Sequence, residues 1–193
     1  VPGTALLIKF ADGSILRKAI GYGNISKDDS AKMKTTDLFR IGSVTKTFIA
    51  SGILIMVKEE IINLDDSVIK LLPDILEYGN KITLEMLLNQ SSAITDYTGD
   101  EEFAETYYYD PTYDWSRQEI IELFKDQELL DEPGKISYYS NSNYYLLGLV
   151  IEKYSGMSLA GYLEEKIFKP LGMNNTYLPQ TTTISGDYCH GYF

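Results

Sequence analysis

The feature that most constrains the fold of this chain is one long apolar stretch. From Val44 to Val57, apolar residues occupy nearly every side of a helical wheel, which is typical of a helix buried in a core. Ser43 precedes this helix and Lys46 follows three residues later, so both side chains lie on one helix face. The unpaired N–H groups and the dipole at a helix N-terminus favour negative charge there. We therefore expect a hydroxyl and an amine within reach of each other at the start of a core helix.

The remaining sequence predicts one hairpin followed by many helices. The segments 4–10 and 14–20 flank Ala11-Asp12-Gly13, in which Asp-Gly supplies the turn. Helices are expected over residues 61–73 and 83–88, and another is expected to start at a capping box at 116–119. A helix over 144–154 is expected to be capped by Asn143 or Asn141 and to end at Gly156. The last expected helix runs from Ser158 to about Phe168. Within the tyrosine-rich acidic segment 97–115, residues 103–115 are expected to be an acidic surface loop, with the lining of a binding site as the alternative. One hairpin followed by many helices predicts an α+β fold, and no segment has the composition of a linker that would divide the chain into separate domains.

Charge and composition exclude several classes of function. The chain has 17 basic and 28 acidic residues and a net charge of -11, which argues against nucleic acid or an anionic membrane as a partner. A single cysteine, Cys189, and a single histidine, His190, provide neither an internal disulfide nor a zinc cluster, so we predict no metal and no cofactor. No apolar run reaches transmembrane length, and residues 1–3 lack signal-peptide features. We expect a cytoplasmic protein or one whose leader has been removed.

The Ser-x-x-Lys pattern is a weak signal by itself. Ser67 and Lys70 also match it, but Ser67 follows Asp65 and Asp66 and is best interpreted as a polar helix cap with a solvated lysine. Ser43 opens an apolar helix, where N–H groups and a desolvated lysine would lower the cost of forming an alkoxide. The alternative for Ser43 is another capping serine with a lysine that extends to solvent.

The second candidate pattern is Tyr139-Ser140-Asn141. It lies between a Pro-Gly break and a strongly apolar helix, so its side chains could project into a cleft. The same Tyr-x-Asn spacing recurs at residues 22–24 and 78–80, where the middle glycine suggests turns. A capped loop is an equally good interpretation of residues 139–141 when the segment is taken alone.

The two patterns in this order, with their surroundings, resemble the serine beta-lactamase and penicillin-binding-protein superfamily, in particular its branch of class C beta-lactamases, DD-peptidases and esterases. The resemblance is carried by residues 1–3, 39–46, 64–66, 87–92, 133–134, 139–141, 147–148, 151–152 and 168–173. It implies a beta-lactamase/transpeptidase-like α+β fold, present here mostly as its helical part and an N-terminal hairpin. Residues 1–193 would form one truncated catalytic domain, with 1–30 in its α/β part and 31–193 mainly helical.

The resemblance also implies acyl transfer through a covalent serine ester on a small-molecule or peptide substrate. Ser43 would be the nucleophile, and Lys46 and Tyr139 would jointly handle its proton. Asn141 would hydrogen-bond an amide of the substrate. Gln90 and Ser91 would not touch the substrate but would contact the residues that do. The physical logic agrees, because a hydroxyl needs a nearby base and the oxyanion needs fixed N–H donors, one of which the backbone of Ser43 would supply.

The chain departs from the family pattern in two places. Relatives usually have His-Thr-Ser-Gly where this chain has Gln90-Ser91-Ser92-Ala93. Because these residues lie behind the expected active site, we expect the change to adjust the positions of the reacting groups and not to alter the mechanism. The third family motif, Lys-Thr-Gly or His-x-Gly, is absent from the sequence. We therefore expect the N-terminal part of a longer protein, with an unpaired hairpin edge prone to self-association. We also expect the isolated chain to be a poor catalyst, which hydrolysis of a chromogenic cephalosporin at the rate of full-length relatives would contradict.

Other functions stay open or are disfavoured. A Ser-His-Asp hydrolase is disfavoured, because the chain has no Gly-x-Ser-x-Gly elbow and its sole histidine is near the chain end. A non-catalytic module that binds penicillin or peptidoglycan-like peptides is the alternative, and a mere folding fragment is the third. The fold does not decide among beta-lactams, D-amino-acid peptides and small esters. The resemblance favours an extracytoplasmic location.

Overall fold

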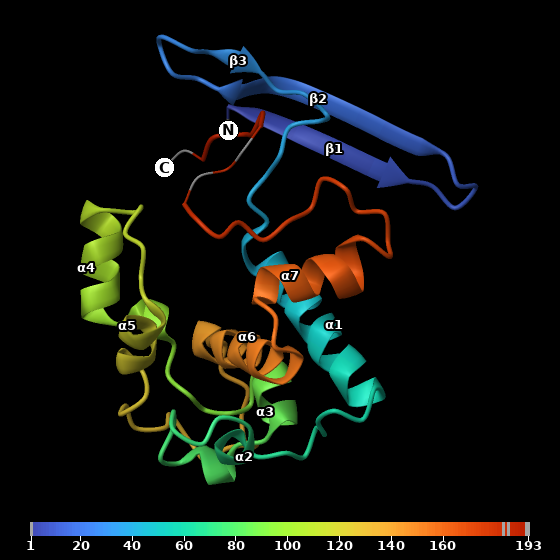
Figure 1. The fold of residues 1–193 in the computed structure, drawn as a ribbon. Helices are drawn as coiled ribbons and strands as arrows, with labels where there is room; N and C mark the ends of the chain where they lie inside the picture. Colours follow the sequence, from blue (N-terminus) through green and yellow to red (C-terminus); the bar gives the residue numbers. More distant parts are fainter. Residues whose placement is uncertain (1, 183, 185, 192–193) are drawn as a thin grey trace. The chain divides into compact units, whose positions relative to one another are not determined.

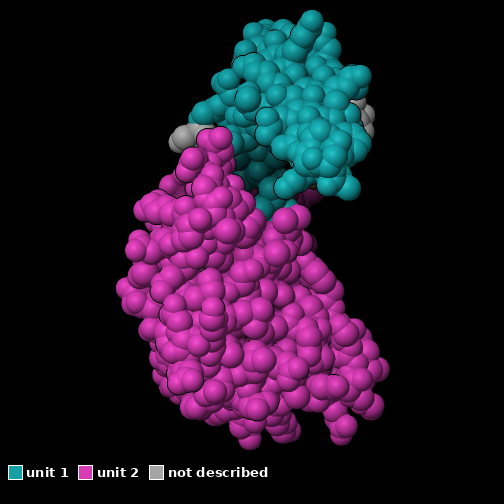
Figure 2. Space-filling model, turned by 90° about the vertical axis from the view of Figure 1, so that its right-hand side faces the viewer, with its two compact units in different colours: residues 1–42, 183–193 teal, residues 43–182 magenta. Residues whose placement is uncertain are grey.

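The computed structural model describes residues 2–182, 184 and 186–191, and its helices and strands are labelled in Figure 1. The chain divides into two compact units, residues 1–42 with 183–193 and residues 43–182 (Figure 2). The strands belong to the first unit and the α-helices to the second. The predicted α+β class is therefore confirmed.

The first unit is built on an antiparallel sheet. The sheet has three strands in the order β1-β2-β3, namely β1 Gly3–Lys9, β2 Ile15–Asn24 and β3 Ala31–Lys32. The predicted hairpin is confirmed, because β1 pairs with β2 and Gly13 adopts a φ of 85° in the turn between them. Residues near the C-terminus belong to the same unit, where Tyr188 forms a parallel bridge with Leu38.

The hairpin exposes apolar side chains on both of its faces. Leu7 and Ile20, which lie on opposite faces because of the strand register, are each 61% exposed. Among the described residues, no strand pairs with the outer edge of β1. Such an edge is a template for pairing with another strand, and the self-association expected from the sequence stays a prediction.

The second unit is helical, with α6 at its centre. Helix α6 contacts α1, α3 and α7 (Figure 1). The helices are α1 Thr45–Lys58, α2 Val68–Leu71, α3 Leu84–Leu88, α4 Glu101–Tyr109, α5 Arg117–Glu122, α6 Asn141–Ser155 and α7 Leu159–Leu163. The shorter turns are η1 Gly42–Val44, η2 Gly79–Lys81, η3 Tyr97–Gly99 and the π-helical η4 Glu164–Phe168.

Local capping signals place several helix ends where the sequence predicts them. The side chain of Thr83 accepts a hydrogen bond from the backbone of Met86 at the start of α3. Ser116 and Glu119 form the predicted capping box of α5, and Ser158 caps α7. Gly156 ends α6 in the left-handed conformation, with a φ of 67°. These predictions are confirmed.

Three expectations about elements are wrong. Residues 103–115 are not a loop throughout, because helix α4, which Asp100 caps, extends to Tyr109, and in it Phe103 stacks on Tyr107. Helix α6 begins at Asn141 and not after an asparagine cap, since the backbone N–H of Asn141 donates to Asp96 from a distant segment. The helix expected over 61–73 is confined to α2. Of the three boundaries, the start of α6 is the one at which a distant segment supplies the contact.

Helix α1 is buried on one face and not all round. Ile49, Gly52, Ile53 and Met56 are buried, whereas Leu54 is 51% exposed. The sequence pattern therefore predicts more buried positions on this helix than the structure has.

Replacing Ile53 with alanine tests this packing. Because Ile53 is fully buried in the core of the helical unit, we expect a loss of about 2–5 kcal/mol in the free energy of unfolding. The adjacent variant Leu54→Ala serves as the control, with an expected change of about 0.5 kcal/mol or less. Urea unfolding would measure both, and equal losses for the two variants would contradict the assigned face.

Candidate active site

Ser43 is placed by the turn that leads into α1. It lies in the 3-10 turn η1, is exposed, and precedes the first residue of α1 by two positions. Its Oγ shares a hydrogen bond of 2.6 Å with the phenol oxygen of Tyr139. Two residues that are far apart in the sequence therefore meet at one hydroxyl.

Lys46 connects the serine to the other side of the site. Its Nζ donates to Ser43 Oγ at 3.3 Å and to Asn141 Oδ1 at 2.6 Å. The same nitrogen lies 4.8 Å from the ring centroid of Tyr139 and 5.6 Å from that of Tyr144, within the range of a cation–π attraction. The ammonium group is thus held at the centre of the cluster.

Extended backbone at Ser140 explains how Tyr139 and Asn141 reach the same site. Ser140 has φ -142° and ψ 126°, and in such backbone alternate side chains point to the same side. Ser140 itself is fully buried, and its hydroxyl donates to the backbone oxygen of Thr95. The flanking Tyr139 is 57% exposed and contacts Ser43, while Asn141 contacts Lys46.

The surroundings of Tyr139 favour its phenolate form. Hydrogen bonding with Lys46, and then with Ser43, holds the pKa of the Tyr139 phenol below its usual value of 10.0. Partial burial and the negative charge of Asp96 act in the opposite direction, but they are the smaller effects in sum. A tyrosine with a lowered pKa beside a serine hydroxyl is suited to accept the serine proton.

Gln90 lies behind the Tyr139–Asn141 segment. Its Oε1 accepts from the backbone N–H of Ser140 at 3.0 Å and from Asn143 Nδ2 at 2.6 Å. The side chain of Ser91 does not contact the cluster and instead donates to Asn89. Its neighbour Ser92 is fully buried and donates to Asn143 Oδ1. The supporting network is therefore formed by Gln90 and Ser92.

Sequence reasoning missed two residues of the site, Asp96 and Thr98. The carboxylate of Asp96 accepts from the backbone and the side-chain amide of Asn141, and Thr98 Oγ1 accepts from Asn141 Nδ2 at 3.2 Å. Asp96 also caps η3 by accepting from the backbone N–H of Thr98. The spacing of Asp96 and Thr98 is typical of an aspartate that accepts a hydrogen bond from the backbone two residues later in a turn. This local pattern predicts the turn but not the contact with Asn141.

The chance matches of both patterns lie elsewhere. Ser67 Oγ accepts from the backbone of Lys70 as the cap of α2, as the sequence predicts. Lys70 Nζ pairs with Asp66, a contact that the sequence does not predict. The Tyr-x-Asn match at 22–24 lies on β2, and the match at 78–80 overlaps η2. Neither provides a serine–lysine–tyrosine cluster.

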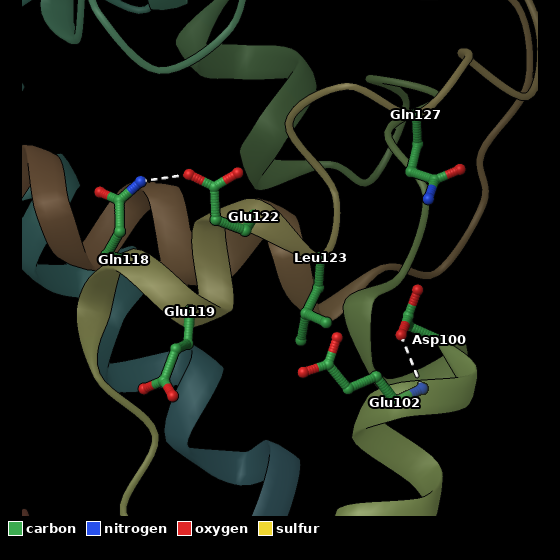
Figure 3. A pocket seen from close by; sticks show the side chains of 7 residues that line it. All are labelled: Asp100, Glu102, Gln118, Glu119, Glu122, Leu123 and Gln127. Carbon is green, nitrogen blue, oxygen red and sulfur yellow. Dashed lines mark hydrogen bonds between the residues drawn. The ribbon is translucent and has the colours of Figure 1, made fainter.

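A separate acidic cavity of about 330 Å³ opens beside α4 and α5 (Figure 3). Its lining residues are Asp100, Glu102, Gln118, Glu119, Glu122, Leu123 and Gln127. None of these belongs to the cluster around Ser43, and none is a serine, cysteine or lysine that could act as a nucleophile. The cavity therefore does not replace that cluster as the candidate active site.

In the described part of the chain, no group of three or more histidine, cysteine, aspartate or glutamate side chains is arranged to hold a metal ion. None of the helices in residues 2–182, 184 and 186–191 has the length and apolar character needed to cross a bilayer.

Comparison with curated proteins and solved structures gives consistent results. Penicillin-binding protein 4* of Bacillus subtilis is 32% identical over 180 residues, which is 90% of this chain and 37% of that protein. A D-stereospecific amidohydrolase from Streptomyces sp. has a TM-score of 0.79 and 31% identity over 89% of this chain and 50% of its own. A penicillin binding protein from Bacillus halodurans has a TM-score of 0.82 and 26% identity over 96% of this chain and 56% of its own.

The chain thus spans 37% of the length of the curated relative and about half of the two solved chains. The fold matches over nearly all of the chain, and the matched relatives carry the names of penicillin-binding proteins and of an amidohydrolase. The family model described as Beta-lactamase matches residues 1–192. The chain belongs to the beta-lactamase family, which includes these penicillin-binding relatives.

Proposed function

We propose that Ser43 is the nucleophile of an acyl-transfer reaction, and that the protein is a serine hydrolase or acyltransferase of the beta-lactamase-related type. The observation that carries the proposal is the contact of Ser43 Oγ with both Tyr139 Oη, at 2.6 Å, and Lys46 Nζ, at 3.3 Å. A serine hydroxyl is a weak nucleophile until a neighbouring group takes its proton. This geometry provides a proton acceptor and a cation at the same oxygen.

In the first step, Ser43 Oγ attacks the carbonyl carbon of an amide, lactam or ester. A bond forms between Oγ and that carbon, and the Oγ proton passes to the Tyr139–Lys46 pair. The tetrahedral oxyanion is stabilised by fixed N–H donors, of which the backbone N–H of Ser43 is one because it lies at the unpaired start of the helix. Collapse breaks the bond to the leaving nitrogen or oxygen, which takes the proton from the pair. An acyl ester remains on Ser43.

In the second step, water or another acceptor releases the acyl group. The acceptor loses a proton to the Tyr139–Lys46 pair, attacks the ester carbon, and Ser43 Oγ leaves and recovers its proton. The same residues thus act as base and then as acid in each half of the reaction. Lys46 supports the phenolate of Tyr139 electrostatically, consistent with the lowered pKa of Tyr139.

Asn141 is proposed to contact the substrate as well as Lys46. Its Oδ1 is occupied by Lys46, and its Nδ2 donates to the carboxylate of Asp96 and to Thr98 Oγ1. Nδ2 carries two hydrogens, so one can stay on Asp96 while a substrate carbonyl replaces the neutral hydroxyl of Thr98. Binding would then exchange one hydrogen bond for another.

The substrate class is proposed from the chemistry of the relatives. One is named a D-stereospecific amidohydrolase and two are named penicillin-binding proteins. Beta-lactams and amides of D-amino acids share a carbonyl–nitrogen bond beside a defined stereocentre. We propose such an amide or lactam as the substrate, with small esters as reactive surrogates.

Labelling with a fluorescent penicillin tests the proposal. Ring opening of the lactam leaves the whole molecule attached to the serine, so we expect a label that survives denaturing electrophoresis. Bound probe that is lost on denaturation would instead indicate the alternative, a non-catalytic penicillin- or peptidoglycan-binding module. Absence of both covalent and reversible binding would contradict each of these functions.

Replacing Lys46 with alanine tests its share of the proton transfer. We expect acylation to slow by about 10²–10⁴-fold, because the ammonium contacts Ser43 and supports the Tyr139 phenolate. The matched control is Lys70→Ala, which removes the lysine of the chance match and breaks only the pair with Asp66. The rate of covalent labelling would measure both. Equal rates for Lys46→Ala and the unaltered protein would contradict the assigned role.

A further inference from the structure

Asp96 lies at the junction of two helix starts in the helical unit. Its Oδ1 accepts the backbone N–H of Thr98, the second residue of η3, and the backbone N–H of Asn141, the first residue of α6, each at 3.1 Å. Helix α6 has 15 residues, so its N-terminus carries a substantial partial positive charge that a carboxylate stabilises. These bonds fix the position of the Asp96 side chain.

The same carboxylate fixes the orientation of the Asn141 amide. Asn141 Nδ2 lies 3.2 Å from Asp96 Oδ1 and 3.1 Å from Asp96 Oδ2. A carboxylate can only accept hydrogen bonds and an ammonium group can only donate them. The NH2 end of the amide must therefore face Asp96, and the carbonyl Oδ1 must face Lys46, 2.6 Å away. The contacts on the two sides of the amide agree on one orientation.

We propose that Asp96 is a positioning residue for the reaction, which aims the carbonyl of Asn141 at Lys46 and thereby holds the Lys46 ammonium beside Ser43. This inference rests on the proposed acyl-transfer function. Asp96 makes no hydrogen bond to Ser43 or Tyr139, and it positions Lys46 through Asn141. The bonds form a chain from Asp96 through Asn141 and Lys46 to Ser43.

Loss of the carboxylate would remove one of the two contacts that set this orientation. With an uncharged partner at position 96, the Asn141 amide is held less firmly and can rotate, which presents its NH2 group to the ammonium of Lys46, where two donors repel each other. Lys46 would then lose its acceptor at 2.6 Å and move relative to Ser43. A displacement of about 1 Å of reacting groups can cost about 10²-fold in rate.

Asp96 also acts on Tyr139 through its charge. The groups that face the Tyr139 phenol are Lys46 from α1, Ser43 from η1, Tyr144 from α6 and the more distant Asp96. Lys46 and Ser43 lower the pKa of Tyr139, whereas the negative charge of Asp96 raises it. The charge of Asp96 is the smallest of these effects, and the hydrogen bond with Lys46 is the largest. If loss of Asp96 displaces Lys46, the pKa of Tyr139 should therefore rise, and the pH midpoint of acylation should move to higher pH, an effect that a purely structural cap would not have.

The variant Asp96→Asn tests the inference in the otherwise unaltered protein. Asparagine is a good helix cap, so the fold should persist while the charge is lost. With benzylpenicillin as the probe, we expect the first-order acylation constant at saturation to fall by about 10- to 100-fold, with the pH midpoint shifted upward. A rate and midpoint equal to those of the unaltered protein would overturn the inference.

The matched control is Asp100→Asn. Asp100 is likewise a capping aspartate, whose carboxylate accepts from the backbone of Glu102 at the start of α4 (Figure 3). It makes no hydrogen bond to Asn141, so acylation and its pH midpoint should stay unchanged. A similar loss in both variants would overturn the inference in favour of a general effect of capping.

A second variant covers the case in which Asp96→Asn fails to unfold cooperatively. Asp96→Ser removes the carboxylate and keeps a capping hydroxyl that can accept from the backbone N–H of Thr98. A fall of about 10-fold or more in acylation by Asp96→Ser supports the inference, and a folded Asp96→Ser that acylates at the rate of the unaltered protein overturns it. Absence of any acyl adduct on the unaltered protein is a different result, because it would contradict the proposed function itself.

Discussion

Replacing Ser43 with alanine is expected to abolish covalent labelling by a penicillin, with a fall of at least about 10³-fold in the acylation rate. The reason is that Ser43 Oγ is the atom to which Tyr139 and Lys46 both point, and alanine leaves them without a nucleophile to activate. The free energy of unfolding should change little, because Ser43 is exposed. Time-resolved labelling followed by denaturing electrophoresis would measure the loss.

The control for this prediction is Ser67→Ala. Ser67 and Lys70 carry the same Ser-x-x-Lys spacing, but Ser67 only caps α2. Removing it should cost about 0.5–2 kcal/mol of stability and leave labelling intact. If Ser67→Ala lost the label and Ser43→Ala kept it, the assignment of the nucleophile would be wrong.

Replacing Tyr139 with phenylalanine is the second large effect that we expect. The substitution keeps the ring beside Lys46 and removes only the hydroxyl that lies 2.6 Å from Ser43 Oγ. A positioned acid–base group contributes about 10²–10⁴-fold to a rate, so acylation should fall by a factor in that range. Tyr108→Phe is the matched control, because Tyr108 is 79% exposed on α4 and takes no part in the cluster.

The pH dependence gives Tyr139 a signature of its own. A base works in its deprotonated form, which is present above its pKa and is lost as the pH falls through that value. Because the pKa of Tyr139 is held below 10.0 by Lys46 and Ser43, the acylation rate of the unaltered protein should rise with pH, with a midpoint below pH 10. The rising part of the profile should be missing in Tyr139→Phe. An unchanged profile in that variant would assign the base to another group.

Local sequence patterns predict the caps and the hairpin well. Thr83, Ser116 and Ser158 cap the helices that follow them, because a capping side chain binds backbone groups only two or three residues away. The Asp-Gly turn between β1 and β2 is local for the same reason. The spacing of Ser43 and Lys46 also suffices to place both on one face of a helix start.

Contacts between distant segments are what the local patterns do not provide. Tyr139 meets Ser43 across 96 positions of sequence, and only the ordered family resemblance suggested that they share a site. Asp96 caps α6 from 45 positions away, so no pattern near Asn141 could indicate it. Helix α4 depends in part on Phe103 stacking on Trp115, which lies outside the helix. Such contacts form only once the chain is packed.

The most direct test of the central claim is the mass of the protein after incubation with benzylpenicillin, followed by peptide mapping. The account predicts a mass increase equal to one whole penicillin molecule, because opening of the lactam ring releases nothing, and it places this adduct on the side chain of Ser43. An adduct on any other residue, or reversible binding with no mass increase, would contradict the claim that Ser43 is the nucleophile.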